Sequence, residues 1–305
     1  MASDLGGIAA YLGFGLLLPA IVALGLVLAV RRSPGGLTGT AIALAFLLSW
    51  IAERGTLEVP GSERWHLVAV AVLALGAFTP WLAVLEHRVP EVLAAAVAAC
   101  CIGVAIGRWV QFPAWTPAHA WAMGSAIGVV GFTTEWCALR RPGAAIPMSL
   151  AACIGTESIL LAMSGFFSLA VPAGAMALAL CAASVVMAQP LHSGDRRVVA
   201  DSPVRTLAGG GALTAVATLG MIAFAGWSYD YSAIEPWMWL APIAAPLALL
   251  LAESPGISSL GDRSGGVRFV VRVVPVVAIC VAALYLAWRA TSADSASDPL
   301  ADLYG

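Results

Sequence analysis

The residue with the clearest chemical potential in this sequence is Glu157, a carboxylic acid inside a long apolar run. If residues 145–164 form a helix, Glu157 lies about 18 Å from its start at a rise of 1.5 Å per residue. An ionised side chain at such a depth in a membrane costs a few kcal/mol and often marks an ion path, a proton relay or a substrate counter-ion. Thr156 and Ser158 flank it with hydroxyl groups that can hydrogen-bond a carboxyl group. The alternative is a structural carboxyl group, paired across helices or neutralised by desolvation, and the sequence favours neither.

Arg108 is the basic residue whose depth best matches that of Glu157. It lies about 25 Å along its own apolar run, counted from Glu91, so the two charges differ in depth by about 7 Å. An arginine side chain can cover that gap if the two helices are neighbours. We therefore predict an ion pair, and removal of one partner from such a buried pair costs about 3–5 kcal/mol. The rival hypothesis keeps Glu157 protonated and lets Arg108 reach the lipid headgroups.

Glycines recur at helical spacing in two consecutive apolar runs: Gly103, Gly107, Gly124, Gly128 and Gly131. The last three and Glu135 are spaced by 4, 3 and 4 residues, which places them on one side of a helix. Because glycine rows let membrane helices approach closely, we predict a tight hairpin of the two helices. Glu135 is a candidate for lining an ion path along this face. We favour instead a carboxyl group that reaches the cytoplasmic interface near Arg140.

These residues are set in a chain with the composition of a membrane protein. Of its 305 residues, 61% are hydrophobic and only 10% are charged, and the mean hydropathy is +0.92. A soluble domain carries roughly a quarter of its residues as charged groups. A membrane span needs about 20 apolar residues to cross a hydrocarbon core of about 30 Å. Ten stretches come close to this length: 8–30, 37–53, 66–86, 91–111, 119–139, 145–164, 166–188, 207–227, 236–252 and 268–288.

The arginines predict the orientation of these spans, because cytoplasmic loops are enriched in positive charge. Placing the N-terminus outside puts 11 of the 15 basic residues, all of them arginines, in cytoplasmic loops. We predict an all-α, polytopic membrane helix bundle of about ten transmembrane helices with both termini outside. Eight or nine is the fallback, since the run 236–252 is short and rich in proline, which predicts either a kinked span or a re-entrant piece. Residues 1–289 would form a single transmembrane domain, and residues 290–305 a short, polar, disordered outer tail.

Signatures of catalysis, metal binding and cofactor binding are missing from this sequence. It contains no H-E-x-x-H, G-x-S-x-G, P-loop or G-x-G-x-x-G motif. The four histidines lie at the ends of apolar runs, which disfavours a haem between spans, and we expect no cofactor and no metal. The six cysteines lie within the runs without any C-x-x-C pair, as expected for packing residues. No basic motif suggests nucleic acid.

Tryptophan and tyrosine gather at the outer ends of the expected spans. This asymmetry predicts either an interfacial aromatic belt or an outer surface that docks a lipid, a flat ligand or a membrane-protein partner. We expect a multi-pass protein surrounded by the lipid bilayer of a cell membrane, namely the bacterial cytoplasmic membrane. The sequence identifies neither the substrate or partner nor the oligomeric state.

Three functions remain open. We narrowly favour a small permease or channel that uses the embedded carboxyl groups. The alternative is a non-catalytic membrane subunit or scaffold, and the third is an intramembrane enzyme that modifies lipid, which lacks any supporting motif. A water-accessible cavity that reaches Glu157 would favour the permease. A solid core with both glutamates paired would favour the scaffold.

Overall fold

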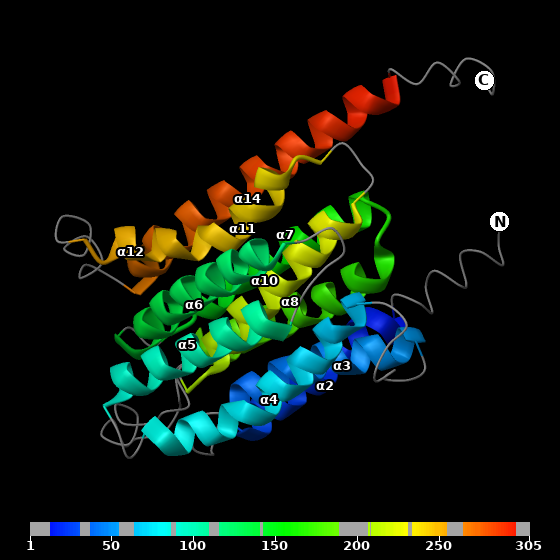
Figure 1. Cartoon of the computed structure of the whole chain (residues 1–305). Helices are drawn as coiled ribbons and strands as arrows, with labels where there is room; N and C mark the ends of the chain where they lie inside the picture. Colours follow the sequence, from blue (N-terminus) through cyan, green and yellow to red (C-terminus); the bar gives the residue numbers. More distant parts are fainter. Residues whose placement is uncertain are drawn as a thin grey trace.

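The structure is a computed structural model that describes residues 13–30, 37–54, 64–86, 90–109, 116–140, 143–188, 207, 209–230, 234–254 and 265–296. Every regular element within these ranges is helical, and none is a strand (Figure 1). The predicted all-α helix bundle is therefore confirmed. The helical stretches of this part of the chain correspond one for one to the ten apolar runs.

The helices begin and end close to the limits expected from hydropathy. Their bounds are η1 Gly13–Leu17, α2 Leu18–Val30, α3 Leu37–Arg54, η2 Arg64–His66, α4 Leu67–Glu86, α5 Glu91–Trp109, α6 Pro117–Arg140, α7 Ala145–Met163, α8 Phe167–Ala188, α10 Gly211–Tyr229, α11 Pro236–Ala244, η4 Ala245–Ala248, α12 Leu249–Ala252 and α14 Gly265–Ala296. Because α14 continues to Ala296, it includes residues 290–296 of the expected polar tail. The remainder of that tail lies outside the described residues.

Six of these helices are long and apolar enough to cross a membrane, judged by length and composition: α3, α5, α7, α8, α10 and α14. Residues 236–252 are apolar but form a broken stretch of α11, η4 and α12. Pro242 in α11 and Pro246 in η4 each lack the backbone N–H that a helix interior needs. The whole stretch is about 25 Å long at helical rise, shorter than a hydrocarbon core of about 30 Å.

Helix α10 is the centre of the bundle. All of its residues from Gly211 to Gly226 are buried, and it packs against α3, α4, α6, α7 and α11. Figure 1 shows α2, α3 and α4 on one side of this core and α11, α12 and α14 on the other. Small residues on α10 and its neighbours allow these contacts: a Cβ added to Gly39 would lie 2.9 Å from the Cα of Gly211.

Helix α14 covers one flank of the bundle and leaves much of its own apolar surface exposed. It packs against α7, α11, η4 and α12. Its Val270, Val274 and Val281 are each more than half exposed. Near its first turns, Nη2 of Arg272 lies 2.6 Å from Oε1 of Glu253, so an ion pair ties α14 to the end of α12.

Candidate functional site

Glu157 lies on the buried side of α7, the helix that packs against α8, α10 and α14. Its side chain is completely buried, and neither carboxyl oxygen has a hydrogen-bond partner. The run from Ala145 continues as a helix to Met163, since its one proline, Pro147, lies in the first turn and its one glycine, Gly155, is accommodated within the helix; Gly165, with a positive φ of 81°, follows its end. The sequence therefore carries the carboxyl group deep into the bundle, as its position in the apolar run predicts.

The two hydroxyl residues beside Glu157 bond elsewhere. The hydroxyl of Thr156 donates to the carbonyl oxygen of Ala152, at 2.8 Å, one turn back in its own helix. The hydroxyl of Ser158 donates to the carbonyl oxygen of Ala170 in α8, at 2.7 Å. Consecutive side chains point about 100° apart around a helix of 3.6 residues per turn, which explains why neither hydroxyl serves the carboxyl group. Ser158 fixes α7 to α8 instead.

Two thiols belong to the same part of the bundle as Glu157. Cys153 is one turn before Glu157, on the same face of α7. Its Sγ lies 3.9 Å from Sγ of Cys280 in α14, and both cysteines are free and buried. The four-residue spacing between Cys153 and Glu157 could have shown from the sequence that they share a face of α7. Nothing in the sequence indicated that Cys280 lies beside them. Within the described part of the chain, no group of three or more histidine, cysteine or acidic residues could hold a metal ion.

Arg108 and Glu157 are not brought together. Arg108 is exposed on α5, and α5 packs chiefly against α6, with a smaller contact to α4. Glu157 lacks any hydrogen-bond partner, so the predicted ion pair between the two is wrong. Matching depths constrain only the positions of two residues along the bundle axis. They do not show that the two helices are neighbours, and α5 and α7 do not pack against each other.

Glu135 caps the N-terminus of the central helix. The backbone N–H of Gly210 donates to its Oε1 at 3.0 Å, and that of Leu213 donates to its Oε2 at 3.2 Å. Gly209 and Gly210 have φ values of 85° and 91°, a left-handed conformation that suits glycine. The first N–H groups of a helix have no partner within it and carry partial positive charge. A carboxyl group from α6 supplies the acceptors that α10 lacks.

This cap corrects the expectation that Glu135 extends to the cytoplasmic interface. Its side chain is completely buried. Arg140, one turn further along α6, places its guanidinium carbon 4.1 Å from the ring centroid of Trp136. A single sequence shows that Glu135 and Arg140 are near each other along one helix. It does not show that the N-terminus of another helix approaches the same spot.

The glycine row of α6 serves two different neighbours. A Cβ added to Gly103 would lie 2.6 Å from the carbonyl oxygen of Gly124, and one added to Gly128 would lie 3.2 Å from that of Ala99. Gly107 likewise lies against the start of α6, at Ala120 and Trp121. Gly131 faces α10 instead, where an added Cβ would meet Cδ2 of Leu213 at 2.9 Å. The contact between α5 and α6 is thus a close backbone approach.

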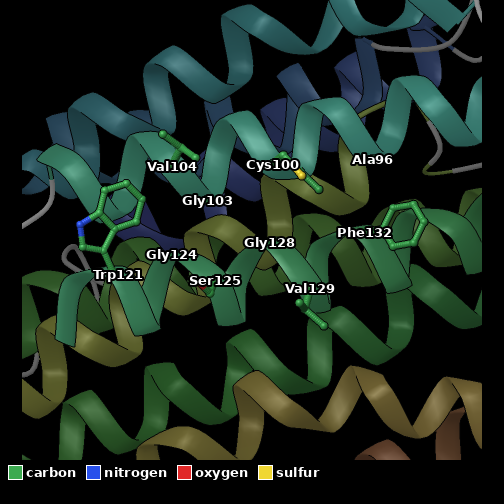
Figure 2. Close-up of a pocket in the computed structure, with 11 residues that line it drawn as sticks. Ala96, Cys100, Gly103, Val104, Trp121, Gly124, Ser125, Gly128, Val129 and Phe132 are labelled. Atoms are coloured by element: carbon green, nitrogen blue, oxygen red, sulfur yellow. The ribbon is translucent and has the colours of Figure 1, made fainter. Parts of the chain in front are cut away.

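A groove of about 400 Å³ runs along the outward side of this contact. Gly103, Gly124 and Gly128 contribute to its lining. Figure 2 shows Trp121 and Phe132 at its two ends, with Val104 from α5 and Val129 from α6 on either side. Neither Glu135 nor Glu157 lines this groove. It therefore does not lead to the embedded carboxyl groups.

Aromatic side chains pack together where α3 and α10 end and where α4 and α8 begin. The Trp65 ring centroid lies 5.2 Å from that of Trp50, 4.4 Å from that of His66 and 5.0 Å from that of Phe166. The guanidinium carbon of Arg54 lies 4.5 Å from the Trp65 ring centroid. Trp50, Trp65 and His66 are buried. This portion of the aromatic set therefore fills space between helices.

The chain matches no protein-family model, no curated protein and no solved structure.

Proposed function

We propose that this protein is a multi-pass integral membrane protein of the cell membrane. Six sufficiently long apolar helices support this placement. So does the surface: soluble proteins rarely expose large contiguous apolar patches, yet valines and leucines of α5 and α14 are exposed along the bundle. The proposal includes about ten spans, with residues 236–252 as a kinked one, in a bacterial cytoplasmic membrane.

The arrangement of helix ends supports termini on the same side. The hydroxyl of Ser49, near the end of α3, donates to the carbonyl oxygen of Gly15 in η1, so η1, the first element that the structure describes, lies at the end of the bundle that holds the aromatic cluster. Helix α14 directs Tyr285 and Trp288, near its own end, to the surface. Because the arginine-rich stretches of the sequence adjoin the other ends of these helices, we place both termini outside.

Within this membrane protein we propose a small permease or channel in which Glu157 binds a proton or a cation. The observation that carries the proposal is the contrast between two wholly buried acids. Glu135 has backbone donors on both oxygens, whereas Glu157 has none on either. An unpaired carboxylate in apolar surroundings costs many kcal/mol, so Glu157 requires a proton or a cation that the bundle itself does not supply.

Helix α14 is the element best suited to open this site. It covers α7 at the contact between Cys280 and Cys153, and it is the least enclosed of the six long apolar helices. Pro275 interrupts its hydrogen bonding about one turn before that contact, and such prolines are common kink points. We propose that bending at Pro275 admits the ion to Glu157.

The test is ion flux through the full chain in proteoliposomes, followed with a pH-sensitive dye and with potassium- and sodium-sensitive dyes. We expect a flux that Glu157→Gln reduces at least tenfold. The variant should remain about as stable as the wild type, because an amide and a protonated acid of nearly the same shape have similar costs of burial. Glu91→Gln is the matched control, since Glu91 is exposed at the start of α5. Equal flux in Glu157→Gln and Glu91→Gln would refute a role for Glu157.

A non-catalytic membrane subunit is the second candidate, and one observation favours it. The groove described above stays on the outer side of α5 and α6 and does not reach Glu157, so it provides no path to this carboxyl group. In that case Glu157→Leu would give a stable protein that still co-purifies with its partner from native membranes. Absence of flux in the wild type, together with such a partner identified by mass spectrometry, would favour this function over the permease.

A further inference from the structure

The groove on the outward side of α5 and α6 combines an apolar lining with a cation at one end. Its walls include Val104, Trp121 and Val129, each about half exposed or more. The two helices approach closely through their glycines, so the floor of the groove is formed by glycine backbone, and larger side chains border it on both sides (Figure 2). The groove is thus a long apolar depression on a surface that faces away from the bundle core.

Arg108 continues the α5 wall of the groove beyond its last lining residue. Cys100 and Val104 line the groove, and Arg108 follows them at the same four-residue spacing, about 6 Å further along the helix. Arg108 is exposed, and no described residue forms an ion pair with it. A Cβ added to the preceding Gly107 would lie 3.0 Å from Cε3 of Trp121. The cation and the tryptophan therefore belong to the same end of the groove.

We propose that this groove binds an anionic phospholipid, with an acyl chain along the groove and the phosphate beside Arg108. The longer wall of the groove, from Trp121 to Phe132 on α6, extends about 16 Å at helical rise, close to the thickness of one leaflet, about 15 Å. Tryptophan at the charged end suits the interfacial zone, where the headgroup lies. Arginine near that zone attracts anionic lipid. The site depends on membrane insertion but not on ion flux through Glu157.

A helix from a second copy is the competing occupant. Such a helix would place an apolar surface against the charge of Arg108, which has no ion-pair partner among the described residues. An anionic headgroup satisfies that charge. For this reason we assign the groove to lipid, and the experiment below includes the second copy as an outcome that overturns the assignment.

The experiment is native mass spectrometry of the delipidated full chain, titrated with dioleoyl phosphatidylglycerol and, separately, with dioleoyl phosphatidylcholine. We expect the anionic lipid to bind the wild type about fivefold more tightly than the zwitterionic one. Arg108→Gln should remove this preference, and Arg108→Lys should retain it. Arg289→Gln is the matched control, because Arg289 is also exposed near the end of an apolar helix, and it should change neither affinity.

Two neighbouring residues of α6 test the groove itself. Ser125 is exposed and lines the groove, whereas Ala126 is exposed and does not. Ser125→Phe should lower the affinity for both lipids, and Ala126→Phe should leave both unchanged. Equal effects of these two variants, or equal effects of Arg108→Gln and Arg289→Gln, would overturn the lipid site. So would a lipid-free dimer that Ser125→Phe converts to a monomer, since a second copy would then fill the groove.

Discussion

Replacing Glu135 by alanine removes both acceptors from the N-terminus of α10 and leaves the N–H groups of Gly210 and Leu213 without partners in a buried site. A buried donor that loses its acceptor costs about 1–3 kcal/mol, so two donors cost about 2–6 kcal/mol. The same change also removes the cost of burying the carboxyl group. We therefore expect a net loss of about 2–4 kcal/mol in the free energy of unfolding. Glutamine keeps one carbonyl acceptor and should lose about half as much.

Thr134→Val is the matched control for this prediction. Thr134 is adjacent to Glu135 and equally buried, and its hydroxyl donates only to Val130 within α6, at 2.8 Å. Valine keeps the shape, so the control should cost less than about 1 kcal/mol. Reversible unfolding in mixed micelles by added SDS gives the free energies.

Hydrogen exchange provides a second, local measurement of the cap. Amide exchange at Gly210 and Leu213 should accelerate in Glu135→Ala, while the end of α10 near Tyr229 should keep its protection, because only the N-terminal acceptors have changed. Unchanged exchange at these two amides, or a Glu135→Ala variant no less stable than Thr134→Val, would refute the assignment of Glu135 as the cap.

Two further predictions concern helix packing and topology. Gly128→Leu should destabilise the protein by about 1–3 kcal/mol, because the new side chain would meet the carbonyl oxygen of Ala99. Val129→Leu should be nearly neutral, because Val129 points outward. Equal thermal stability of the two variants in detergent would contradict the close approach of α5 and α6. Cysteines introduced at Ser62 and Ser193 should be labelled by a membrane-impermeant maleimide from opposite sides, Ser62 from outside; labelling of Ser193 from outside would overturn the orientation.

Hydropathy alone was enough to locate the helices of this protein. An apolar run of about 20 residues can satisfy its backbone only as a helix when lipid surrounds it, so the length and spacing of the runs predict the elements without any tertiary information. Proline spacing likewise predicted that residues 236–252 would be irregular, and α11, η4 and α12 show where the break lies. The depth of Glu157 along α7 followed from the same counting.

The partners of the buried charges were decided only by the tertiary structure. Counting along the sequence gives a residue its depth and its helix face, but it does not say which helices are neighbours. Arg108 and Glu157 have similar depths and lie on helices that do not pack together, whereas Glu135 meets a helix N-terminus more than seventy residues away in sequence. Cys280 and Cys153 are likewise far apart in sequence and in contact in the structure. Apolar side chains pack non-directionally, so the hydrophobic pattern leaves the order of helices around α10 open. Glycine contacts and hydrogen bonds between side chains and backbone groups of neighbouring helices select it.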